Sequence, residues 1–350
     1  MDSDKTYASC ESRIRALVYS YDPTCRHGQV SSIRVGPARP VLSVSRGSVI
    51  GRPAAPERHP YITHVANPGE LMWEKDFYEL SVVAGRQEGM ITGAQANRLG
   101  VGTAALDHLR GVGLLSELDW DVHQLAGGSL APRFAYPYAA WLAIRPETFR
   151  WERPDGPLDV VLSHESACGL HGLGSVAAPL MTFTAAEELP APRATRIHVS
   201  RLSPEDVMVH RGVLVTTPLR TLLDLVADWV EHAHIQRAVT DAVRRDLVDL
   251  RVLHEGMKPL AEEHDYPVDG PEFVGYFMPH LQPGSLSVRN LRAYAALVSG
   301  ERVAEVRPRV ARVLAEARHA FGSPVAGESG PDEVLSRDLA AEIVGRIGWD

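Results

Sequence analysis

One short stretch decides how the N-terminal half of this chain folds: residues 89–115, GMITGAQANRLGVGTAALDHLRGVGLL. Thr92 and Thr103 are residues that favour the N-cap position, so each is expected to begin a short helix, and Gly100 ends the first of the two. Leucines three residues apart form the inward face of the second helix. Two short helices joined by a glycine-containing turn predict a helix-turn-helix.

The flanking residues extend this unit to a winged helix-turn-helix over residues 71–136. A helix with apolar residues at helical spacing precedes it, and the segments 114–118 and 121–125 predict a two-stranded ribbon after it. The second helix, residues 102–113, is then the recognition helix. Its outward positions, with two polar residues of the preceding helix, form the expected DNA-binding set: Gln95, Arg98, Thr103, Ala104, Asp107, His108 and Arg110.

The charge of this segment leaves a second interpretation open. Residues 71–136 carry five basic and eight acidic groups, and the whole chain has a formal net charge of −8. Glu117, Asp119 and Asp121 lie on the ribbon, where they repel a DNA duplex. The alternative is a helical domain that binds protein, or that binds nothing.

The rest of the chain predicts three further parts. Glycine and proline interrupt every period in residues 1–70, so we expect a disordered leader there. Residues 137–284 alternate short helices with strands at hairpin-like spacing, and residues 285–350 form a helical tail. We therefore predict an α+β fold. The strands are expected at Asp159–Leu162, Met181–Thr184, Arg196–Ser200, Val207–His210 and Val213–Thr216.

Two polar groups of the second domain are candidate sites. His164 and His171 are seven residues apart on a helix that Ser163 can cap, but no third zinc ligand follows at a recognised spacing. We expect them to fix a helix–strand junction by hydrogen bonds. Arg220 and Asp224 are four residues apart on a helix, where they form either an ion pair or a polar face for a partner.

Common enzyme signatures are absent from the sequence. No phosphate-binding loop, G-x-S-x-G or H-E-x-x-H motif occurs, so we expect a protein that is not an enzyme and has no cofactor and no metal. The chain has three cysteines and no C-x-x-C pair, and residues 1–30 lack the pattern of a signal peptide. No apolar run is long enough to span a membrane. We expect a cytoplasmic protein.

Three segments, taken in order, resemble the AbiEi-type antitoxin family of bacterial type IV toxin–antitoxin systems. The segments are residues 89–115, residues 161–174 (VLSHESACGLHGLG) and residues 212–225 (GVLVTTPLRTLLDL). The first is similar to the N-terminal winged helix of that family, and the other two are similar to its C-terminal antitoxin domain. The motif positions in the second domain are Ser163, His164, Ser166, His171, Thr217, Arg220 and Asp224.

The resemblance implies an antitoxin that also represses its own promoter. Its winged helix would bind operator DNA through Arg98, Thr103, His108 and Arg110, with possible self-association on DNA. Its second domain would oppose a nucleotidyltransferase-like toxin without a stable complex. The family's wing commonly carries arginines, whereas this ribbon is acidic. The alternative is therefore a protein-interaction module whose winged helix no longer binds DNA.

Overall fold

The computed structural model describes residues 70–128, 130–174, 178–320 and 330–347 of the 350 residues. All but the last position of the predicted leader lies outside the described residues. The chain divides into two units between Lys75 and Asp76, and the elements described below lie in the second unit, Asp76–Asp350, apart from the first residues of one helix. Helices combine with two small sheets, which confirms the predicted α+β class. No helix of the described part is long and apolar enough to cross a membrane.

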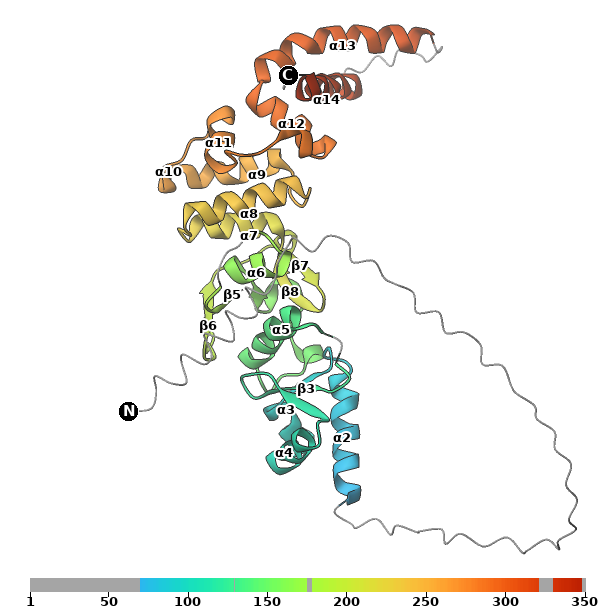
Figure 1. The fold of residues 1–350 in the computed structure, drawn as a ribbon, viewed down its shortest axis with the longest axis vertical. Coiled ribbons are helices and arrows are strands. Elements are labelled where there is room, and N and C mark those ends of the chain that lie inside the picture. Colours follow the sequence, from blue (N-terminus) through green and yellow to red (C-terminus); the bar gives the residue numbers. More distant parts are fainter. Residues whose placement is uncertain (1–69, 129, 175–177, 321–329, 348–350) are drawn as a thin grey trace, which may run out of the picture. The chain divides into compact units, whose positions relative to one another are not determined.

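The first group of elements contains a small antiparallel sheet. In chain order the elements are α2 (Glu70–Ala84), β1 (Met90–Thr92), α3 (Gly93–Arg98), α4 (Thr103–Gly111), β2 (Leu115–Glu117) and β3 (Val122–Leu125) (Figure 1). The predicted ribbon is present as β2 and β3, and β1 adds a third strand on the free edge of β3, in the order β1-β3-β2. The sequence pattern did not indicate β1, because three residues are too few to show a period.

The caps of the two short helices differ from one another. Thr92 caps α3 as predicted: its side chain accepts a hydrogen bond from the backbone N–H of Gln95, and the Gln95 side chain accepts one from the Thr92 N–H. The prediction that Thr103 caps α4 is wrong by one residue. Gly102 is the N-cap and Thr103 is the first helical residue, with no side-chain cap bond.

A five-stranded mixed sheet follows. The elements are α5 (Pro132–Ile144), β4 (Val161–Leu162), α6 (His164–His171), β5 (Met181–Ala185), β6 (Thr195–Val199), β7 (Val207–His210) and β8 (Val213–Thr216). The strand order is β6-β5-β4-β8-β7. β7 and β8 form an antiparallel hairpin, but β5–β6 and β4–β8 run parallel. The hairpin-like spacing in the sequence had indicated an antiparallel neighbour for β6, which is wrong. The residue pattern of a strand does not encode the direction of its neighbour, which only the connecting loop sets.

Helices make up the remainder of the described chain. They are α7 (Pro218–Ala227), α8 (His232–Arg244), α9 (Leu250–Met257), α10 (Ala261–His264), α11 (Gly270–Phe277), α12 (Val288–Val298), α13 (Gly300–Ala320) and α14 (Gly330–Ile347). Thr217 caps α7 and Pro218 is its first residue, a position that proline favours. A short 3-10 turn that contains a proline, Lys258–Leu260, separates α9 from α10.

Among the described residues, three hydrophobic clusters join most of these elements. One joins α5 and the five-stranded sheet, and it also includes Met90 and Val122 from the small sheet. A second joins α7, α8, α9, α11 and α12, and a third lies between α12, α13 and α14. The predicted domain boundary at 136/137 is crossed by the first cluster, and the boundary at 284/285 is crossed by the second. Neighbouring parts of the chain therefore share buried apolar residues at both boundaries, through α5 at the first and α12 at the second.

Candidate functional site

The outer surface of α4 presents four of the residues that the sequence indicated. Thr103, Ala104, Asp107 and His108 are exposed, whereas Leu106 and Leu109 are buried on the opposite side of the helix. This division follows the helical period, because residues three and four apart share a face. The side of α4 that faces solvent is therefore the side expected to contact DNA.

The two arginines of the predicted set are both engaged with carboxylates. Arg110 forms ion pairs with Asp107, on its own helix, and with Glu117 on β2. These partners, with the hydrogen bond to Asp107 first among them, raise the pKa of Arg110. The guanidinium of Arg110 reaches solvent but has both of its terminal nitrogens committed within the protein.

Arg98 is held in a similar way on the preceding helix. Its guanidinium donates to both carboxylate oxygens of Glu152, at 2.8 and 2.9 Å, and lies 4.4 Å from the ring centroid of Phe149. The hydrogen bond from Arg98 is the main reason that the pKa of Glu152 falls to about 2. The side chain is still 42% exposed, so one face of it remains open to solvent.

Gln95 does not belong to this surface, so its place in the expected DNA-binding set was wrong. The side chain is fully buried. Its amide exchanges hydrogen bonds with Gln87 and donates to the carbonyl of Thr148 at 2.8 Å, in addition to the capping bond described above. The capping position that the sequence identified for Thr92 requires this inward orientation, because the fourth residue of a capping box must fold back onto the cap.

A hollow of about 190 Å³ lies between α3, α4 and the ribbon. Three carboxylates line it, those of Asp107, Glu117 and Asp121, together with Arg110 and His123. The local excess of negative charge agrees with the acidic composition of the segment and opposes a close approach of phosphate.

The second-domain motif lies at the junction of α6 with the five-stranded sheet. His171 donates from Nε2 to the carbonyl of Thr216 at 2.7 Å, and it is buried. Ser166 is buried too; its hydroxyl donates to the carbonyl of Leu180 and accepts from the N–H of Thr182. These bonds tie the helix to β5 and β8, which is the architectural role expected for His171.

The second motif helix, α7, carries a partly buried ion pair. Arg220 donates to Asp224 at 2.7 Å and to Asp206 at 3.1 Å. Burial raises the pKa of Asp224 against the opposing effect of the Arg220 hydrogen bond. The ion pair predicted between these residues is therefore present, and the second carboxylate oxygen of Asp224 is buried with no hydrogen-bond partner among the described residues.

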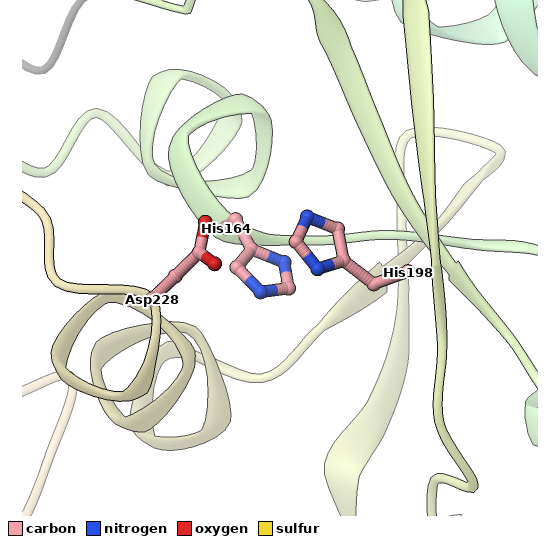
Figure 2. Close-up of side chains that lie close together, drawn as sticks. All are labelled: His164, His198 and Asp228. Carbon is pink, nitrogen blue, oxygen red and sulfur yellow. The ribbon is translucent and has the colours of Figure 1, made fainter.

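His164 has a different setting from His171. It is the first residue of α6, with a φ of 51°, and its Nδ1 shares a hydrogen bond with the hydroxyl of Ser163 at 2.9 Å. Its ring stacks on that of His198 from β6, with centroids 4.0 Å apart. The carboxylate of Asp228, at the end of α7, completes a group of three (Figure 2).

The electrostatics of this group favour a neutral His164. Burial first, and the nearby charge on His198 second, lower the pKa of His164 to about 4. The ring is thus neutral near pH 7. The sequence indicated His164 together with His171, seven residues away on the same helix, but the residues that meet the His164 ring come from two other elements. No spacing signal links positions 164, 198 and 228, because the contact depends on how β6 and α7 pack.

Comparisons with known proteins add no relative. No model of a known protein family matches the chain, and a search of curated proteins finds no match. The function is therefore argued from the residues and their geometry.

Proposed function

We propose that the chain is a winged-helix DNA-binding regulator that also acts as an antitoxin. The observation that carries the first part is the element order α2-β1-α3-α4-β2-β3 with the strand order β1-β3-β2. In a winged helix, the second helix of the helix-turn-helix lies before a β-ribbon and enters the major groove. Here α4 occupies that position and the β2–β3 ribbon is the wing.

The DNA-contacting surface in this proposal is the exposed side of α4. Thr103, Ala104 and His108 are the residues that approach base edges, and Arg98 and Arg110 are the residues that contact phosphate. Both arginines must exchange a carboxylate partner for a phosphate, which makes binding modest and sensitive to salt. Such affinity favours two protomers on a repeated operator over one protomer alone.

The antitoxin role belongs to the second domain. It is supported by the similarity of residues 161–174 and 212–225 to the antitoxin domain of the AbiEi type. In the fold these two segments are β4 with α6, and β8 with α7, and they lie against one another through the bond of His171 to Thr216. The partner would be a nucleotidyltransferase-like toxin, opposed without a stable complex.

The test of DNA binding is a salt titration of the purified protein on the duplex upstream of its own reading frame. We expect binding in dilute buffer that weakens steeply with salt. Arg98→Ala and Arg110→Ala should each reduce the slope of log K against log salt, by about 0.9 where the arginine has exchanged its carboxylate for a phosphate. Arg244→Ala is the matched control, since Arg244 is also an exposed arginine paired with an aspartate three residues away. Absence of binding even in dilute buffer would end the repressor proposal.

The ion pairs of Arg98 and Arg110, and the carboxylates around the α4 hollow, favour a second candidate function. In this alternative the winged helix contacts a protein and not DNA. The double variant Arg98→Ala, Arg110→Ala separates the two. If DNA binding is the function, the variant loses its operator but still protects cells that express a nucleotidyltransferase-like toxin from the neighbouring reading frame. If the alternative holds, the wild type and the variant show the same weak affinity for the duplex.

A further inference from the structure

Three potential metal ligands from three separate elements converge at one edge of the five-stranded sheet. His164 begins α6, His198 lies on the edge strand β6, and Asp228 follows the last residue of α7. One ligand atom from each lies within 4.8 Å of the others. Figure 2 shows the three side chains pointing toward one another from their different elements.

We propose that His164, His198 and Asp228 bind a divalent transition-metal ion, with Zn²⁺ as the fitting representative. Two imidazole nitrogens and one carboxylate oxygen are a common protein ligand set for zinc, and a water molecule supplies the fourth position. Zinc–ligand distances of ~2.0–2.2 Å place tetrahedral ligand atoms about 3.4 Å apart. The three ligand atoms therefore need to approach one another by up to about 1.4 Å, and the rings of His164 and His198, which are stacked here, must rotate so that a nitrogen of each points at the ion.

The surroundings of the two histidines support a ligand role. Nε2 of His198 is buried and has no hydrogen-bond partner among the described residues, and an unsatisfied buried nitrogen is unfavourable unless something binds it. Nδ1 of His164 is bonded to the Ser163 hydroxyl, which in turn accepts a hydrogen bond from Thr184 at 2.8 Å. Metal-bound histidines use such a bond on the second ring nitrogen to fix the orientation of the first.

One neighbouring cation competes with a metal. Nη1 of Arg196 lies 3.8 Å from Oδ2 of Asp228, and the Arg196 side chain is 52% exposed. A contact of that length on an exposed side chain is weak, so Arg196 can turn into solvent when the ion arrives. Arg220 is already committed to Asp224 and Asp206 and does not need to move.

A metal at this position joins β6 and α7 to the start of α6. β6 is an edge strand that pairs on one side with β5, and α7 belongs to the helical cluster. An ion held by both is expected to stabilise the folded state, since it binds the folded chain and not the unfolded one.

The test uses the full-length protein after treatment with a chelator. Titration with Zn²⁺ in a calorimeter should show one ion per chain, and Co²⁺ in its place should give the intense visible absorption of tetrahedral coordination. Thermal unfolding should shift to higher temperature with added Zn²⁺. No binding by the wild type, or Co²⁺ absorption of the weak octahedral kind, would overturn the proposal.

Variants locate the site on these residues. His198→Gln and Asp228→Asn replace half-buried side chains and should weaken zinc at least about tenfold while leaving the metal-free melting temperature close to that of the wild type. His280→Gln, an exposed histidine elsewhere, should bind zinc as the wild type does. Where either ligand variant lowers the metal-free melting temperature, loss of the zinc-induced shift in that temperature is the deciding readout. Wild-type zinc affinity in both ligand variants would refute the assignment.

Discussion

Release of Arg110 from its two carboxylates tests whether the α4 surface is built for DNA. Asp107 and Glu117 each bind one terminal nitrogen of Arg110, so the double variant Asp107→Asn, Glu117→Gln frees both arms and removes two negative charges. A freed arginine that contacts a phosphate displaces about one counterion. The slope of log K against log salt should therefore steepen by up to about 0.9 per protomer, which is the part of this contact that Arg110 does not make while its carboxylates hold it.

The assay is fluorescence anisotropy on the upstream duplex between 50 and 200 mM salt. Across that fourfold range, the affinity of the variant should fall by up to about 3.5-fold more than that of the wild type, and the variant should bind more tightly at the low-salt end. The control is Glu262→Gln, Glu263→Gln, which removes the same charge from exposed positions on α10. If the two double variants have the same slope, and Arg110→Ala also leaves the slope of the wild type unchanged, Arg110 does not contact phosphate and the reasoning fails.

Three further predictions concern stability. The pKa of His164 is about 4 in the folded chain and 6.5 is its ordinary value, so between these pH values the unfolded chain binds the proton more readily than the folded chain. In metal-free buffer, the free energy of unfolding measured with denaturant should therefore fall by about 3 kcal/mol from pH 7 to pH 4. The fall should be smaller in His164→Asn. Asn290 is fully buried and donates to the carbonyls of Val243 and Val248. Asn290→Ala should therefore lower the free energy of unfolding by roughly 2–4 kcal/mol in the same measurement. A decrease under about 1 kcal/mol would contradict this. A Cβ at Gly270 would overlap the carbonyl oxygen of Leu297, so Gly270→Ala should lower the melting temperature, and an unchanged value would show that the α11–α12 contact yields easily.

Local signals in the sequence determined where several elements begin and end. Thr92 caps α3, the Thr217–Pro218 pair begins α7, and Gly172 ends α6 in the left-handed conformation. Each of these depends on hydrogen bonds within about four residues, or on the backbone freedom of one residue. The exposed and buried sides of α4 also followed from the helical period alone.

Contacts between distant residues were decided only by the tertiary structure. The strand β1, the parallel direction of β6 and the inward turn of Gln95 depend on neighbours far along the chain. The same holds for the partner of Arg98, which is 54 residues away, and for the meeting of His164 with His198 and Asp228. The residue pattern of a helix or strand shows which face that element buries. It does not show which other element lies against that face, so strand pairing and the meeting of distant side chains depend on how whole elements pack.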